Sequence, residues 1–135
     1  MNRQLLLAAE KGDADSQFNL GVLYANDIDD NHYAVEGNRV EAERWFLAAA
    51  EQGLPRAQIR LAEMYAEAPD IAESEIKACG WYLLATTSLR GAHLHRAQSG
   101  YEHMYSRLTP GQVEEVRRFV SNWKPMRPNE GGASP

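Results

Sequence analysis

Three histidines lie close together in the sequence and have side chains able to bind metal or move protons. His93 and His95 are separated by one residue, and His103 follows them on the same stretch. Imidazole is the commonest metal ligand and a frequent general base, but zinc needs three or four converging ligands. No cysteine or carboxylate pair completes the set. We interpret the histidines as polar turn and helix residues, and keep a small metal-dependent or hydrolytic enzyme using them as the alternative function.

Two other features lack the requirements of a reactive site. Asp27, Asp29 and Asp30 alternate as in calcium-binding loops, but the required glycine at the sixth position and glutamate at the twelfth are missing. Cys79 lies beside an apolar helical stripe, which is typical of a small buried residue. The sequence has no nucleophile elbow, phosphate loop or His-Glu-x-x-His motif. We therefore predict no catalytic residue, no metal site and no cofactor.

The composition indicates an ordinary globular chain. It has 135 residues, 44% hydrophobic residues, one cysteine and a net charge of −5. This length suits one domain, and an acidic chain lacks the basic patch of a nucleic-acid-binding protein. No apolar run is long enough for a signal peptide or a membrane span. We expect a single cytoplasmic domain over residues 1–124 that binds neither nucleic acid nor membrane.

A block running from glutamine to tyrosine occurs three times with the same internal offsets. The copies are residues 17–24, 58–65 and 98–105. A second pattern, Ala-x-x-Trp-Phe/Tyr-x-x-Ala, occurs at residues 42–49 and 78–85. Recurrence at about forty residues predicts a stack of helical repeats.

Helical periodicity and capping residues predict seven helices, with Gly12 and Gly91 ending two of them. The expected ranges are 2–11, 14–26, 39–52, 55–67, 73–90, 95–107 and 110–123. Asp13 or Asp15 is expected to cap the second helix, and Asn38 the third. The sequence Thr-Pro-Gly-Gln from residue 109 predicts a capping box for the seventh helix. This last helix has no repeat partner, so we expect it to cover the end of the stack.

Two segments fall outside this pattern. Residues 26–37 are polar and lack periodicity, which predicts a flexible loop or one that contacts a partner. Residues 125–135 are rich in proline and glycine and predict a disordered tail.

The repeated pattern resembles that of Sel1-like repeats, which are relatives of tetratricopeptide repeats. The resemblance rests on Ala-x-x-Trp-Phe-x-x-Ala-Ala-x-x-Gly followed by Ala-Gln-x-x-Leu-Gly/Ala-x-x-Tyr, and it covers roughly residues 5–123. It implies an all-α solenoid of about three helix pairs stacked into a right-handed superhelix, closed by a capping helix at 110–123. Family members commonly act as adaptors in bacterial signalling, secretion or cell-envelope assembly. Two residues depart from the pattern: Ser16 replaces the usual alanine, and Glu102 stands where a small residue is expected.

The resemblance also implies a concave face built from the first helix of each pair. Carried onto this sequence, it comprises Asp15, Phe18, Val22, Arg56, Ile59, Glu63, Arg96, Ser99 and His103. Arg56 and Arg96 occupy matching positions in neighbouring copies, where they would meet an acidic peptide or a C-terminal carboxylate. The alternative is two solvated arginines that balance Glu63 and Glu67.

The hypothesis from sequence is a scaffold that binds an unknown protein or peptide on this concave face. We expect a monomer or a weak dimer. A repeat module that works only by self-association through its exposed N-terminal edge is a further alternative.

Overall fold

The described part of the chain is built from α-helices. The computed structural model describes residues 3–26, 36–67 and 72–126, and every regular element in these ranges is an α-helix. Contacts between Cα atoms divide the chain into two compact units. The first unit comprises residues 1–57 and 125–135, and the second comprises residues 58–124.

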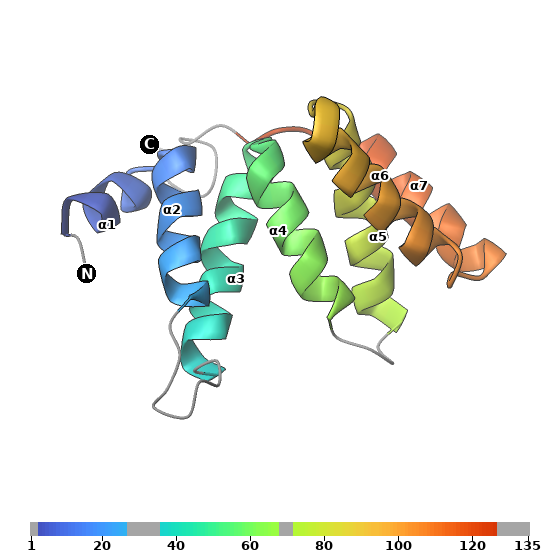
Figure 1. The fold of residues 1–135 in the computed structure, drawn as a ribbon, viewed down its shortest axis with the longest axis horizontal. Helices are drawn as coiled ribbons and strands as arrows, with labels where there is room; N and C mark the ends of the chain where they lie inside the picture. Colours follow the sequence, from blue (N-terminus) through green and yellow to red (C-terminus); the bar gives the residue numbers. More distant parts are fainter. Residues whose placement is uncertain (1–2, 27–35, 68–71, 127–135) are drawn as a thin grey trace. The chain divides into compact units, whose positions relative to one another are not determined.

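In the first unit, α2 (Ala14–Ala25) packs against both α1 (Arg3–Glu10) and α3 (Glu36–Glu51) (Figure 1). Leu20 and Phe46 are fully buried between these helices. The ring of Phe46 lies on the backbone of α2, because a Cβ atom placed on Gly21 would be 2.8 Å from two of its carbon atoms. The helix pair therefore depends on the absence of a side chain at Gly21.

The second unit contains most of α4 (Pro55–Ala66), whose first turn belongs to the first unit, and three further helices. α5 (Ala72–Thr86) packs against α6 (Gly91–Tyr105) and α7 (Pro110–Asn122) (Figure 1). A Cβ atom on Gly100 would be 2.4 Å from the ring of Tyr82, and one on Gly80 would be 2.5 Å from Phe119. Aromatic rings thus fill the positions of missing side chains in both units.

Local signals place several of the helix ends where the sequence predicts them. Gly12 and Gly53 have φ of 101° and 94°, the left-handed conformation that closes a helix. The Asp13 carboxylate accepts a hydrogen bond from the backbone N–H of Ser16 at 3.0 Å. At the start of α7, Thr109 and Gln112 form the predicted reciprocal capping box.

Two predicted boundaries are wrong. Gly91 does not end α5 but opens α6, four residues before the predicted start, with φ of 60°. α5 ends earlier because its last turn meets hydroxyl side chains: Thr86 and Thr87 donate hydrogen bonds to the carbonyl groups of Leu83 and Leu84.

Asn38 is not an N-cap, because α3 already begins at Glu36. The cap of this helix and the predicted loop, apart from its ends, lie outside the described residues, as does most of the predicted tail. No helix among the described residues combines the length and apolar character needed to cross a bilayer.

The tyrosines that end the three copies of the repeated block are not fully buried. Tyr82 is 6% exposed, whereas Tyr24 and Tyr65 are half-buried and Tyr105 is 42% exposed. The two tyrosines that end the first two copies therefore lie at the border of the core. Tyr105 packs beside the ring of Tyr101 at a centroid distance of 5.7 Å.

Glycine contacts generate the first prediction. Gly21→Ala should lower the free energy of unfolding by about 1–3 kcal/mol, because Phe46 must leave a well-packed position. Gly111→Ala is the matched control: its new Cβ atom would meet nothing closer than 4.0 Å. Urea unfolding of both variants measures the difference. Equal stabilities of the two variants would contradict a packing role for Gly21.

Candidate functional site

The predicted binding residues of α2 lie on one face of that helix. Asp15, Phe18 and Val22 are spaced by three and four residues, which places them on one side of a helix. Asp15 is exposed, while Phe18 and Val22 are half-buried. Asp13 fixes the start of the helix through its bonds to Ser16, and these bonds lower the pKa of the Asp13 carboxyl group.

Arg56 extends from the first turn of α4 over this face. Its Nη2 atom lies 2.5 Å from Oδ1 of Asp15, and its Cζ atom lies 5.0 Å from the centroid of the Phe18 ring. Phe18 in turn contacts Phe46, with ring centroids 5.7 Å apart. Buried Phe46 thus contacts half-buried Phe18, and Phe18 contacts the guanidinium group of Arg56. The side chain of Arg56 is 55% exposed. We call Asp15, Phe18 and Arg56 the Arg56 cluster.

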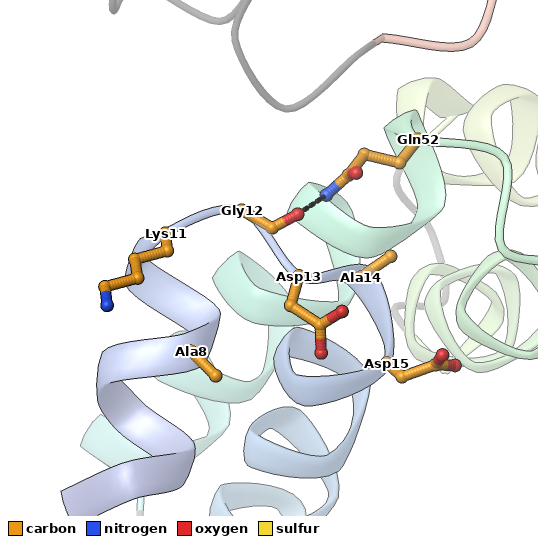
Figure 2. Close-up of a pocket in the computed structure, with 7 residues that line it drawn as sticks. All are labelled: Ala8, Lys11, Gly12, Asp13, Ala14, Asp15 and Gln52. Carbon is orange, nitrogen blue, oxygen red and sulfur yellow. Dashed lines mark hydrogen bonds between the residues drawn. The ribbon is translucent and has the colours of Figure 1, made fainter.

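A shallow hollow of about 550 Å³ lies beside this cluster, at the turn between α1 and α2. Figure 2 shows its lining residues, with the Gln52 side chain reaching the Gly12 carbonyl group. Gln52 donates hydrogen bonds to that oxygen at 2.8 Å and to Oε1 of Gln17 at 2.9 Å. Gln17, which is buried, donates to the carbonyl of Ala9.

These glutamine contacts hold the α1–α2 turn against the end of α3. Sequence reasoning gave Gln17 and Gln52 no role, although Gln17 opens the first copy of the repeated block. The repeated glutamine could have indicated a buried polar contact in the first two copies, whereas Gln98 in the third copy is exposed. Gln58, its counterpart in the second copy, is 2% exposed.

In the second unit, Arg96 and Glu63 form a two-bond ion pair. Nε of Arg96 donates to Oε2 at 2.8 Å, and Nη2 donates to Oε1 at 2.5 Å. Ser99 and His103 are exposed on the same helix as Arg96. Both predicted arginines therefore have acidic partners, and these partners are themselves predicted binding residues.

Ile59 is wrongly predicted as a surface residue. It is 3% exposed and belongs to a core cluster with Ala85 and Ala97. α4 turns this residue toward α5 and α6, so a partner on the surface cannot contact it.

The three histidines do not form a metal site. No group of three or more histidine, cysteine, aspartate or glutamate side chains able to hold a metal occurs in the described ranges. His93 and His95 lie within α6 rather than in a turn, and neighbours two positions apart point to nearly opposite sides of a helix. All three imidazoles are exposed.

Two ionisable side chains are buried among the described residues of the second unit. Cys79 is fully buried as predicted, and burial raises the pKa of its thiol to about 11. Burial, assisted by the charge of Glu63, raises the pKa of Tyr82 to about 12. A thiol that stays protonated at neutral pH is a poor nucleophile, so Cys79 serves packing.

Comparison with known proteins adds to this geometry. Residues 14–54 and 55–87 each match the Sel1 repeat, and together these ranges make up more than half of the chain. The third copy predicted from sequence lies outside the matched residues. Curated proteins yield no match.

A solved structure gives a second comparison. A protective antigen present in uropathogenic Escherichia coli strains, which displays an SLR fold, has a TM-score of 0.70 to this chain at 25% identity. The match covers 88% of this chain but only 24% of the antigen, so this chain spans about a quarter of that protein. The predicted fold class, an all-α solenoid of Sel1-like helix pairs, is confirmed by these findings.

The two ion pairs should differ in strength. We expect a double-mutant cycle of Arg96→Gln and Glu63→Gln to give a coupling of about 1 kcal/mol, because two bonds join these side chains. The cycle of Arg56→Gln and Asp15→Asn should give about 0.5 kcal/mol or less, since one exposed contact is involved. Urea unfolding measures both couplings. A larger value for the second cycle would reverse this ranking.

Stability should fall in alkaline solution. The folded state binds the protons of Cys79 and Tyr82 more tightly than the unfolded chain does, because the pKa values rise from 9.0 to about 11 and from 10.0 to about 12. Their stabilisation is complete below pH 9 and is lost as the pH rises to 12.

Urea unfolding between pH 8 and pH 12 tests this dependence. Cys79→Ala should remove the part of the loss between pH 9 and 11, and Tyr82→Phe the part between pH 10 and 12. A wild-type stability that stays constant over this range, or variants with the same pH dependence as wild type, would refute it.

Proposed function

We propose that this chain, which belongs to the Sel1 repeat family, is a scaffold that binds a protein or peptide through the exposed faces of its repeats. Sel1 repeat proteins generally act as protein-interaction scaffolds. The Arg56 cluster is the single observation on which we base the assignment of this role to particular residues. It presents a charged pair and an aromatic ring at fixed places on the surface.

A fixed cluster of this composition suits protein recognition. Arginine and aromatic side chains contribute most often to the energetic centres of interfaces. Ordering a long side chain on binding costs free energy, and Arg56 is already ordered by Asp15 and Phe18. A partner at this surface therefore meets an arginine that needs little further ordering.

The second unit contributes its own exposed residues to the proposal. Ser99 and His103 lie on α6 together with Arg96, whose guanidinium group binds the carboxylate of Glu63. Apart from Ile59, which is buried, the predicted concave-face residues of each unit are at least partly accessible to solvent. We propose that both sets contribute to partner binding.

The proposal includes no catalytic step. The Sel1 repeat fold is typically a non-enzymatic scaffold, and we assign the exposed histidines no catalytic role. A cytoplasmic location and a monomeric or weakly dimeric state complete the proposal.

Affinity capture with the tagged full chain in its native cell tests this function. Arg56→Glu and His103→Glu alter the proposed surfaces of the first and second unit. Arg118→Glu is the control, because Arg118 is exposed on α7, which carries none of the proposed residues. We expect a specific protein to be retained by wild type and by the control, and to bind at least about tenfold more weakly to Arg56→Glu, a loss near 1.4 kcal/mol.

Circular dichroism must first show that each variant keeps its helices. Retention of the same partner by both surface variants, at wild-type affinity, would refute the proposed faces. Equal losses in all three variants would place the binding surface elsewhere.

A further inference from the structure

The two matching arginines are used differently. Arg96 gives Nε and Nη2 to the two carboxylate oxygens of Glu63. Arg56 gives only Nη2, to a single oxygen of Asp15, and no other acceptor binds its guanidinium group among the described residues. The two residues are therefore not equivalent members of one binding face.

The geometry of guanidinium explains why this difference matters. Its N–H groups form two edges that share Nη2, and each edge pairs with two carboxylate oxygens at once. One oxygen of Asp15 occupies one N–H of Nη2, so Arg56 keeps a complete edge for another carboxylate. At Arg96, Glu63 fills the edge formed by Nε and Nη2, and the edge formed by Nη1 and Nη2 remains. The two arginines therefore differ in how firmly each holds its acidic partner.

The acidic partners also differ in how readily they can be displaced. The side chain of Asp15 is 67% exposed and makes a single ion-pair contact, whereas that of Glu63 is 29% exposed and makes two hydrogen bonds. An exposed single contact stabilises a protein little, so Asp15 can turn into water at small cost. Release of Glu63 would require both bonds to break.

Phe18 keeps Arg56 in place when Asp15 leaves. Cation–π attraction to the ring, with Cζ 5.0 Å from its centroid, does not depend on the carboxylate. The ring itself is held by Phe46. Arg56 can therefore exchange its acidic partner without losing its position.

We infer that Arg56 is the anchor for a carboxylate of the partner protein, supplied by an aspartate or glutamate side chain, which exchanges with Asp15. Arg96 is instead a clamp that joins α6 to α4 through Glu63. Asp15 indicates that a side-chain carboxylate is the ligand that fits, because its own carboxylate already binds the guanidinium group of Arg56. This inference rests on the proposed function and adds the chemical class of the partner's anchoring group.

Nuclear magnetic resonance of the full chain with isotope-labelled arginine tests the inference. The probe is the peptide Gly-Glu-Gly-Glu-Gly, acetylated and amidated at its ends. We expect the Nε–H signal of Arg56 to shift and saturate with this peptide, while the Arg96 signal stays in place. The matching glutamine peptide should shift neither signal, and added salt should weaken binding.

Two matched substitutions separate exchange from simple charge attraction. Asp15→Asn removes the competing carboxylate and should tighten peptide binding about threefold or more. Glu63→Gln removes the same charge from the second unit and should leave binding at Arg56 unchanged. Arg56→Lys keeps the charge but lacks the fork, and it should weaken binding severalfold.

Several outcomes would overturn the inference. They are an unmoved Arg56 signal, equal shifts at Arg96, or unchanged binding in Asp15→Asn. A shift produced by a pentaglycine with a free C-terminus, but not by the glutamate peptide, would assign the anchor to a chain end and refute a side-chain carboxylate. If a captured partner depends on the proposed faces while the peptides fail, the scaffold function stands and only the carboxylate anchor falls.

Discussion

Aromatic rings packed on glycine hold the helices of each unit together. The ring of Phe46 lies on α2 at Gly21, and the ring of Tyr82 lies on α6 at Gly100. In each case the ring fills the place where another residue would carry its Cβ atom. Burying a large ring against backbone combines apolar burial with close approach of two helices. These contacts set how closely α2 approaches α3 and how closely α5 approaches α6.

The Arg56 cluster shows how the core determines the surface. Gly21 admits Phe46, whose ring supports Phe18, and that ring supports the guanidinium group of Arg56. Each contact in this series restricts the movement of the next side chain. A change in the interior of α2 would therefore be felt at an ion pair on the surface, without any change in the charged residues themselves.

Local signals made much of the fold predictable. The capping box at Thr109, the left-handed glycines at Gly12 and Gly53, and the helical spacing of apolar residues all act within a few residues of the positions that they determine. Gly91 misled the prediction because glycine before a helical block reads equally well as the end of one helix or the start of the next. The hydroxyl residues Thr86 and Thr87 decide between these choices.

The candidate site was harder to predict, because it depends on partners distant in sequence. Ile59 has the spacing of a surface position on α4, yet α5 and α6 cover it. Likewise, the partner of Arg96 is 33 residues away, and the partner of Arg56 is 41 residues away. Periodicity places a residue on a face of its helix but does not show which neighbour covers that face.

The two arginines illustrate why matching positions in repeats need not share a function. α4 begins two residues before Ala57, whereas α6 begins six residues before the matching Ala97. Arg56 consequently lies in the first turn of its helix, and Arg96 lies in the second. From the first turn, Arg56 reaches Asp15 at the start of α2, while Arg96 reaches Glu63 well inside α4. In the first copy, the position that matches Glu63 is Val22, so Arg56 meets no carboxylate there and pairs with Asp15 instead.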